Sequence, residues 1–285
     1  MSFPSQKNLQ AGELRVVATP LGNPGDLSPR AKEALATADC ILAEDTRRTG
    51  LLLAQCGIKA TRMASLHDHN EEKKLNSVLQ ELEQGKNLAL VSDAGTPLLS
   101  DPGYRLVRSC REAGFTVRPL PGPSAPLTAL CASGLPPQPF IFLGFPPRKT
   151  GEQNKFFAPY ATLSVTVIFF ERKDRLHDTL NTLYHLYGKR EVCVARELTK
   201  TYEEFIHLYL DDLSALPQEL LGEITVIVGP PLEDIKTPQE SVLALAKELQ
   251  QENNGTLKPR ALAKLLKDKT SGWSTDDIYA LLGRQ

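Results

Sequence analysis

The chain has 285 residues, enough to bury roughly three quarters of its unfolded surface in two domains or in one domain with an appendage. Its 33 basic and 34 acidic residues give a formal net charge of −1, which argues against indiscriminate nucleic-acid binding. No apolar run approaches the roughly twenty residues of a membrane span, and the polar N-terminus lacks a secretory h-region, so we expect no membrane association and a cytoplasmic location.

The cysteines are scattered through the chain without a C-x-x-C pair, and several lie in apolar surroundings. This usage predicts buried thiols in a reducing compartment. Nothing in the sequence requires a disulfide or a metal for stability. The five are Cys40, Cys56, Cys110, Cys131 and Cys193.

Short apolar strands alternate with amphipathic helices through the first half of the chain. The strands are expected at residues 14–18, 40–43, 88–91 and 115–117, with a short extended run near 62–66. The helices are expected after Ser28, at 49–55, after Asn70 and near 104–113. Ser28 and Asn70 are the predicted N-caps, and Gly57 is a fitting C′ residue. The alternation predicts an α/β domain with a parallel sheet.

A Pro- and Gly-rich stretch at 134–139 is typical of a linker between two such halves. The second half is expected to hold strands at 140–143, 165–170, 192–195 and 224–228, a helix near 176–187 and a hairpin over 204–210. We therefore divide the chain into a flexible tail at 1–12, an N-terminal α/β domain at 13–134, a C-terminal α/β domain at 135–231 and a helical appendage at 232–285.

The appendage differs in kind from the two halves. Three short helices are expected there, the last capped by Ser274. The middle helix is basic, because residues 258–269 hold five Lys or Arg residues against Asp268 alone. A helix-turn-helix-like unit that contacts RNA and a solvated helical cap on the second domain both fit this pattern.

The stretch at 90–103 carries an apolar strand directly into a turn rich in Gly, Pro and Asp. Open α/β sheets bind ligands at the carboxyl ends of their strands, so this turn is the main candidate binding site. Asp93 offers a carboxylate, Gly95 lets the backbone approach a ligand closely, and Thr96 adds a hydroxyl. Two carboxylates without a nearby lysine suit a hydroxyl, an amine or a cation better than a phosphate. The simpler alternative is an ordinary turn in which Asp101 caps the helix that starts near Gly103.

Several well-known catalytic motifs are absent from the sequence. It holds no G-x-G-x-x-G after a strand, no G-x-x-x-x-G-K-[ST] and no H-E-x-x-H. Residues 122–126 come near a nucleophile elbow, but Ala125 and Pro126 replace its ending, which argues against a serine hydrolase. His67 and His69 share one face of an extended segment, yet no third ligand follows at a useful spacing, so we expect no metal.

Eight short segments stand out together by their order and spacing. They are residues 17–23, 43–47, 67–71, 91–97 with 100–103, 119–125, 132–135, 195–200 and 222–226. As a set they resemble the ribosomal RNA small subunit methyltransferase I family of the tetrapyrrole methylase superfamily, over about residues 14–228. The chain departs from the usual family sequence at 170–176 and after Lys200, while the segments of the first half match closely.

The resemblance implies a two-lobed α/β fold of the tetrapyrrole methylase-like, class III methyltransferase type, with a small C-terminal helical domain. It implies that S-adenosylmethionine (SAM) binds between the lobes and that the protein is a homodimer. The implied reaction is methylation of the 2′-hydroxyl of cytidine 1402 in 16S ribosomal RNA of the small subunit, with no DNA partner. A porphyrin or corrin methyltransferase and an inactive ribosome-associated binding protein of the same fold are the alternatives.

The resemblance also assigns residues to the cofactor. They are Pro20, Leu21, Asp93, Ala94, Gly95, Thr96, Leu99, Ser124, Ala125, Phe170, Ala195, Glu223, Ile224 and Thr225. Contacts to the RNA substrate are expected on other strand-end loops, at Asp45, Arg47, His67, Asn70, Glu71 and Lys149.

Catalysis is expected to need a base, because an alcohol is a poor nucleophile until its proton leaves. Our hypothesis gives this role to Glu197 or His69, while Arg47, Arg196 and Lys200 hold phosphates. The alternative is structural: Glu44, Arg47, Arg196 and Glu197 form a salt-bridge network between the domains.

Overall fold

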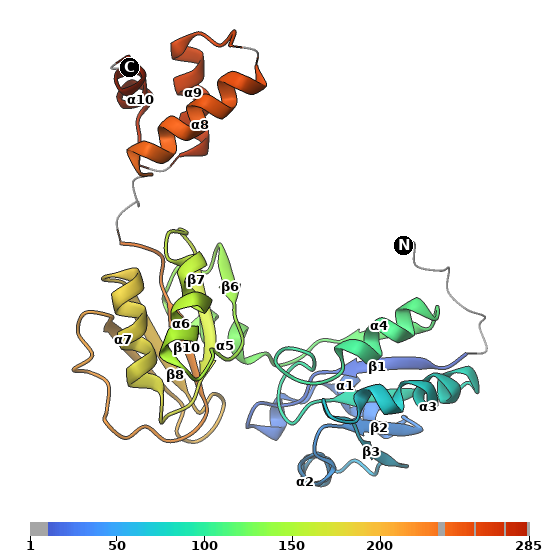
Figure 1. The fold of residues 1–285 in the computed structure, drawn as a ribbon. Helices are drawn as coiled ribbons and strands as arrows, with labels where there is room; N and C mark the ends of the chain where they lie inside the picture. The colour runs from blue at the N-terminus through green and yellow to red at the C-terminus, as the bar shows by residue number, and fades with distance from the viewer. Residues whose placement is uncertain (1–10, 233–236, 254, 271, 284–285) are drawn as a thin grey trace.

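The computed structural model describes residues 11–232, 237–253, 255–270 and 272–283. Most of the predicted tail at 1–12 lies outside these residues. The described chain folds into two α/β lobes followed by three helices (Figure 1). No helix among the described residues is long and apolar enough to cross a membrane.

The first lobe is built on a five-stranded parallel sheet of order β3-β2-β4-β1-β5. Its strands are β1 (Glu13–Val17), β2 (Cys40–Ala43), β3 (Met63–Ser65), β4 (Leu88–Val91) and β5 (Thr116–Leu120). β2 and β4 are buried along their whole length, which is why their sequences are continuous apolar runs rather than alternating ones. The expected parallel sheet is confirmed.

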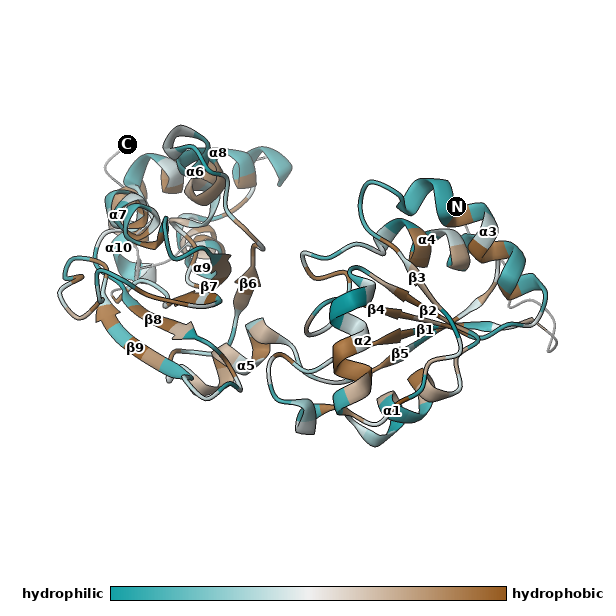
Figure 2. Ribbon diagram, turned by 90° about the horizontal axis from the view of Figure 1, so that it is seen from below, coloured by the Kyte–Doolittle hydropathy of each residue, from teal (hydrophilic) through white to brown (hydrophobic). Residues whose placement is uncertain are grey.

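Helices cover both faces of this sheet. They are α1 (Pro29–Ala36), α2 (Thr46–Gln55), α3 (Glu71–Glu83) and α4 (Tyr104–Glu112), with a 3-10 turn, η1, at Pro24–Asp26. Figure 2 shows the hydrophobic strands enclosed between α1 and α2 on one side and α3 and α4 on the other. Two separate apolar clusters form, one on each face; Leu82 and Leu106 belong to the first, and Leu35 and Leu53 to the second.

The second lobe contains a mixed five-stranded sheet of order β6-β7-β10-β8-β9. Its strands are β6 (Phe140–Phe142), β7 (Thr166–Glu171), β8 (Glu191–Arg196), β9 (Glu204–Tyr209) and β10 (Ile224–Val228). Only the β6 and β7 pair is parallel. The helical elements are α5 (Ala125–Ala132), α6 (Thr150–Phe157), η2 (Ala158–Tyr160) and α7 (Leu176–Tyr187).

Helix α5 connects the two lobes. It follows β5 of the first sheet in sequence, yet Ala129 and Leu130 pack on the second sheet, against Ile168, Cys193 and Ile227. Helices α6 and α7 cover the opposite face of that sheet. Because the first lobe's chain supplies a core helix to the second, the lobes meet at the start of α5. The predicted domain limits at 134 and 231 stay a proposal; the limit at 134 assigns α5 to the first domain, although its core residues pack on the second sheet.

The C-terminal segment forms α8 (Gln239–Glu252), α9 (Pro259–Lys269) and α10 (Thr275–Leu282), which share an apolar core of their own. The predicted cap is confirmed: the Ser274 hydroxyl accepts a hydrogen bond from Asp277 N and is part of a capping box. The apolar side of α9 is buried, and its basic side chains are exposed to solvent.

Several local predictions are wrong. Asp101 does not cap α4, whose N-cap is Gly103 at φ +118° without a side-chain hydrogen bond. Asn70 occupies the N-cap position of α3, but its side chain accepts from His67 N and donates to Ser65 O instead of capping. Residues 204–210 form no hairpin of their own, because β9 pairs with β8.

The prediction of buried thiols holds for three of the five cysteines. Cys40, Cys110 and Cys193 are buried, whereas Cys131 is exposed and Cys56 is half-buried. Cys131 lies near the end of α5, where its apolar sequence neighbours gave a misleading signal of burial. By contrast, the caps Ser28 and Gly57 are confirmed.

One buried carboxylate joins two helices of the first lobe and provides a stability prediction. The Glu71 side chain is buried and accepts a hydrogen bond of 2.8 Å from Leu106 N, in the first turn of α4. Glu71→Ala leaves that amide without its partner, so we expect a loss of about 1–3 kcal/mol in the free energy of unfolding. Its neighbour Glu72 forms an exposed ion pair with Arg105, so Glu72→Ala should cost less than about 1 kcal/mol. Urea unfolding of both variants measures the difference, and equal losses would contradict the assignment.

Candidate functional site

A cavity of about 540 Å³ lies between the lobes, at the carboxyl ends of β2 and β4. From the first lobe it is lined by the turn after β4, by Glu44 and Arg48 and by the start of α5. From the second lobe it is lined by residues 170–174 and 222–225 and by Phe145 and Leu198. Its size is in the range that small-molecule sites occupy.

The structure brings together at this cavity most of the residues that the sequence assigned to the cofactor. They are Leu21, Asp93, Ala94, Gly95, Thr96, Leu99, Ser124, Ala125, Phe170, Glu223, Ile224 and Thr225. Pro20 and Ala195 are buried and do not line it. Ala195 lies beneath the surface, paired with Thr225 of β10.

The turn after β4 is held by hydrogen bonds to neighbouring strand ends. Thr19 and Gly95 form an antiparallel bridge, in which Thr19 N donates to Gly95 O at 2.8 Å and Gly95 N donates to Thr19 O at 3.1 Å. The Thr96 hydroxyl donates to Pro123 O at 2.9 Å. These bonds fix the backbone of the turn against the loops after β1 and β5. The cavity wall is therefore formed by rigid backbone before any ligand binds.

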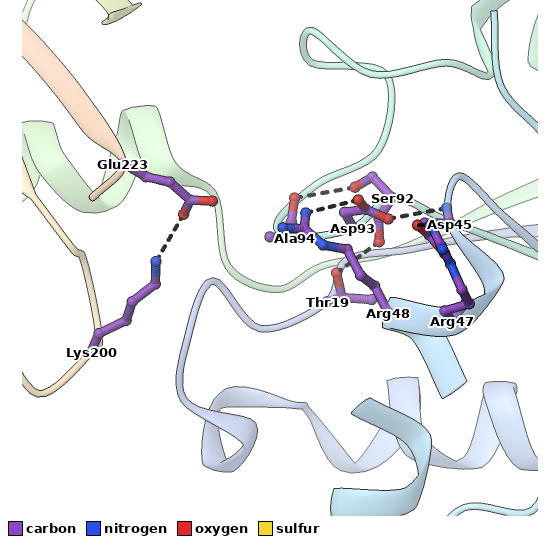
Figure 3. Close-up of polar contacts among 9 residues, drawn as sticks. All are labelled: Thr19, Asp45, Arg47, Arg48, Ser92, Asp93, Ala94, Lys200 and Glu223. Carbon is purple, nitrogen blue, oxygen red and sulfur yellow. Dashed lines mark hydrogen bonds and ion pairs between the residues drawn. The ribbon is translucent and has the colours of Figure 1, made fainter. Parts of the chain in front are cut away.

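Asp93 is part of this support. Its carboxylate accepts from Asp45 N at 3.1 Å and pairs with Arg48 at 2.9 Å, as Figure 3 shows. Both partners come from the segment after β2, so Asp93 joins the ends of two adjacent strands. The charge of Asp93 is thus partly neutralised by a cation that lines the same cavity.

The backbone conformation at position 95 requires glycine. Its φ is +80°, and a Cβ there would lie 3.1 Å from Leu21 Cδ2. Any side chain would be strained and would press on a residue that itself lines the cavity.

Ser124 offers a polar atom that no described residue uses. The residue is buried, lines the cavity, and its hydroxyl oxygen has no hydrogen-bond partner within the described part of the chain. Buried hydroxyls in folded proteins are nearly always paired, so this one is suited to a polar group of a ligand.

Two carboxyls at the cavity have shifted pKa values. Burial raises the pKa of Asp101 to about 6, and the nearby Glu44 and Asp93 carboxylates add to this, although the Ser92 hydroxyl within hydrogen-bonding reach opposes it. Burial also raises the pKa of Glu44, again with help from Asp93. Neither carboxyl forms an ion pair in the segments that the structure describes.

The residues predicted for catalysis lie outside the cavity lining. The Glu197 carboxylate accepts from Lys200 Nζ at 2.9 Å and from Glu223 N at 3.0 Å, and the Lys200 ammonium holds the pKa of Glu197 below its usual range. Lys200 also pairs with Glu223 (Figure 3), and Arg196 pairs with Glu204. His69 is exposed, next to the His67 ring.

The alternative of a salt-bridge network between the domains is wrong for these residues. Arg47 pairs with Asp45 in its own turn, while Arg196 and Glu197 pair within the second lobe. The lobes instead touch through neutral contacts, such as the bond from Asn23 N to the Thr199 hydroxyl.

The predicted RNA contacts also lie beside the cavity rather than in it. Arg47 and Lys149 are highly exposed, and His67 and Asn70 are hydrogen-bonded to each other. Glu71 is buried against α4, so its carboxylate is not available to a large ligand. No group of three or more metal-ligating side chains was found in the described ranges.

Sequence reasoning missed several residues that line the cavity. Ser100, Phe145 and the segment 171–174 had no assigned role, and the predicted capping role of Asp101 is wrong. The sequence did hold a signal that Asp101 lies at the binding site, because Asp101 follows Asp93 on the same strand-end loop. An Asp before Pro-Gly also fits the N-cap of a helix, so the local sequence does not distinguish a capping Asp101 from one that lines the cavity.

Comparisons with known proteins agree on the family. A family model described as Tetrapyrrole (Corrin/Porphyrin) Methylases matches residues 13–214. A protein of Escherichia coli O157:H7 named Ribosomal RNA small subunit methyltransferase I is 46% identical over 241 residues, which are 82% of this chain and 84% of that protein. A protein of the same name from Streptococcus pyogenes serotype M3 (strain SSI-1) is 40% identical over 267 residues, 93% of this chain and 92% of that protein. The chain belongs to the tetrapyrrole methylase family.

Solved structures of tetrapyrrole methylases share the fold. The methyltransferase CobJ aligns with a TM-score of 0.60 at 19% identity, covering 80% of this chain and 98% of CobJ. Uroporphyrin-III C-methyl transferase from Thermus thermophilus, solved with S-adenosyl homocysteine, aligns with a TM-score of 0.55 at 18% identity, covering 76% and 97% of the two chains. The expected two-lobed tetrapyrrole methylase fold is confirmed.

The raised pKa of Asp101 in this tetrapyrrole methylase predicts a dependence of stability on pH. The folded state binds the Asp101 proton more tightly than the unfolded state, whose carboxyl has a pKa near 3.8. The associated stability is present below about pH 4 and is lost as the pH rises through about 6. The free energy of unfolding of Asp101→Asn, relative to that of the unsubstituted protein, should therefore increase as the pH rises from about 4 to about 7. Urea unfolding at both pH values measures this, and a difference that does not change with pH would contradict the shift.

Proposed function

We propose that the chain is a SAM-dependent methyltransferase that methylates the 2′-hydroxyl of cytidine 1402 in 16S ribosomal RNA of the small subunit. The observation that carries the proposal is the cavity between the lobes, lined by the segments that resemble the family motifs. The relatives, at 40–49% identity, are named Ribosomal RNA small subunit methyltransferase I, which supports ribosomal RNA of the small subunit as the substrate.

The residues of the cavity fit SAM by their chemistry. This ligand has no phosphate, and the lining accordingly holds no glycine-rich phosphate loop. It has a cationic sulfonium, and six of the lining residues carry carboxylates. The Ser124 hydroxyl, which no described residue hydrogen-bonds, is available to a polar group, and Gly95 leaves room beside Leu21.

The bound cofactor would supply a methyl group activated by its positive sulfur. The protein's own contribution is positioning, because holding two reactants about 3–3.5 Å apart removes much of the entropic cost of reaction. The backbone of residues 93–96 and the start of α5 form one wall, and residues 223–225 form the other.

The proposed substrate contacts are exposed cations outside the cavity lining. Arg47 and Lys149 are exposed cations on opposite lobes, suited to phosphates of the RNA backbone. The exposed basic side chains of α9 offer further contacts of the same kind. The proposed setting is a homodimer in the cytoplasm, acting on the small ribosomal subunit and not on DNA.

Transfer of labelled methyl tests the proposal directly. Small ribosomal subunits prepared from a strain that lacks the enzyme are incubated with the protein and labelled SAM, in parallel with a porphyrin precursor. We expect label in RNA, recovered as 2′-O-methylcytidine at position 1402 after nuclease digestion. Label in the porphyrin alone would favour a tetrapyrrole enzyme, and cofactor binding without transfer to either would favour an inactive binding protein.

Gly95 provides a test of the cofactor site that does not depend on turnover. In Gly95→Ala the strained backbone and the contact with Leu21 should weaken binding of S-adenosylhomocysteine by about tenfold or more, a cost of about 1.4 kcal/mol. Gly57→Ala is the matched control, because φ there is +66° but a Cβ meets nothing within 4 Å. It should lose some stability and keep its affinity. Calorimetry measures both; unchanged binding in Gly95→Ala would place the cofactor elsewhere.

A further inference from the structure

We propose that Asp101 is the catalytic base that accepts the proton of the ribose 2′-hydroxyl during methyl transfer. This inference rests on the proposed function, because it names the group that completes the same site. A general base must reach the substrate and keep a lone pair available for the proton, and the carboxylates that line the cavity are the candidates for this role.

Four of the six cavity carboxylates are already occupied by cations. Asp93 pairs with Arg48 at 2.9 Å, and Glu223 pairs with Lys200 at 3.1 Å. Each of these carboxylates already has an ion-pair partner that occupies an oxygen which a substrate hydroxyl would otherwise reach.

The remaining two occupied carboxylates belong to the second lobe. The Glu171 side chain is fully buried, where it pairs with Arg175 and accepts from the Thr179 hydroxyl at 2.6 Å. Asp174 lies 3.4 Å from Arg172 on the exposed surface. Glu171 is thus a structural anchor between β7 and α7. Only Asp101 and Glu44 are left without a cation among the described residues.

The position of Asp101 distinguishes it from Glu44. Glu44 directly follows β2, and its carboxylate is held by a hydrogen bond from the backbone of Asp93. Asp101 lies on the loop that meets the second lobe. There, a Cβ added to Gly144 would lie 2.9 Å from the Ser100 hydroxyl. Asp101 therefore stands where the two walls of the cavity approach each other.

The backbone around Asp101 is strained in a way that fixes its direction. Leu98 and Ser100 both adopt the left-handed region, at φ +74° and +72°, which non-glycine residues rarely occupy. Pro97 and Pro102 stiffen the same segment. Strain of this kind costs free energy and persists where the surrounding structure enforces it, and it is commonly found at functional sites.

The charges that face Asp101 come from both lobes. On its own lobe, the Ser92 hydroxyl is within hydrogen-bonding reach, and Glu44, Asp93 and Asp68 repel a negative charge. Across the cavity, the charged lining residues of β7 and the segment after it are Glu171, Arg172, Lys173 and Asp174, joined by Arg48 and Glu223 at the other edges. Because the pKa of Asp101 is about 6, its carboxyl is mostly ionised at neutral pH and can take up a proton.

The proposed step is a single displacement. A lone pair of the 2′-oxygen forms the new bond to the methyl carbon, and the bond from that carbon to sulfur breaks with its electron pair moving to sulfur. The hydroxyl proton passes to the Asp101 carboxylate, which later releases it to water. One cationic sulfonium is consumed, one proton is released, and a neutral thioether and a 2′-methyl ether remain.

Asp101→Asn tests the proposal, because the amide keeps the shape of the side chain and cannot accept the proton. With small subunits as substrate, we expect kcat to fall by about 100-fold or more, within the range of general-base contributions. Binding of S-adenosylhomocysteine, measured by calorimetry, should stay within about threefold, which also shows that the variant is folded. The control Asp178→Asn removes a carboxylate of α7 that does not line the cavity and should change neither quantity.

The pH profile provides an independent readout. For the unsubstituted protein, kcat/KM should rise with pH and level off above about 6, and a carboxyl titration of Asp101 followed by NMR should show the same midpoint. Glu44→Gln removes a like charge, so it should move both the rise in kcat/KM and the NMR midpoint of Asp101 to lower pH.

Several outcomes would overturn the proposal. Asp101→Asn with full activity would exclude Asp101 as the base, and a large loss of transfer in Glu44→Gln alone would assign the base to Glu44. Loss of the pH-dependent rise in kcat/KM in Glu197→Gln or His69→Ala would likewise assign the base to the substituted residue. If the unsubstituted protein binds the cofactor but transfers no methyl to RNA, the proposed function itself fails, and that result is distinct from all of these.

Discussion

Parallel pairing of β1, β2 and β4 is the constraint on which the cavity depends. In a parallel sheet all carboxyl ends lie at one edge, so the loops that follow these three strands must meet there. The bridge between Thr19 and Gly95 and the bond from Asp45 N to Asp93 then join those loops directly. Segments that are far apart in sequence thus become one wall. The functional groups need no flexible segment to bring them together, because the hydrogen bonding of the sheet has already done so.

The second lobe is constrained differently. Its sheet is mixed, and most of its pairs are antiparallel, so no single edge gathers all the loops. The parts that reach the cavity are the end of β7 and the start of β10, which are neighbours in the antiparallel pair of Glu171 with Ile224. Helix α5 holds this sheet close to the first lobe, since its core residues belong to the second lobe and its first residues line the cavity. A short connection and a shared helix therefore set the distance between the walls.

The sequence was informative where one physical effect dominates. The apolar runs at β2, β4 and β10 predicted buried strands, because a strand covered on both faces carries apolar side chains at every position. Ser28 and Ser274 were correctly predicted as caps, and both side chains accept from the backbone of their own helix. Asn70 and Asp101 look equally suitable as caps in sequence. In the structure Asn70 bonds Ser65 and His67, and Asp101 lines the cavity. Tertiary contacts determine the role of both side chains, and a local capping pattern carries no information about those contacts.

The wall residues that the sequence missed owe their role to contacts between segments that are far apart in sequence. Phe145 contacts Phe170 within the second lobe at a centroid distance of 5.2 Å, and Gly144 of the second lobe lies against Ser100 of the first, but no local motif indicates either contact. The environment of Asp101 likewise combines carboxyls from the ends of β2 and β4 with a strained loop of its own. Asp101, Glu44 and Asp93 bring like charges together at the cavity. The Ser124 hydroxyl, which has no hydrogen-bond partner among the described residues, lines the same cavity, and Leu98 and Ser100 are left-handed residues on the loop of Asp101. Each of these features costs stability, and such costs are expected where a fold gives up stability for function.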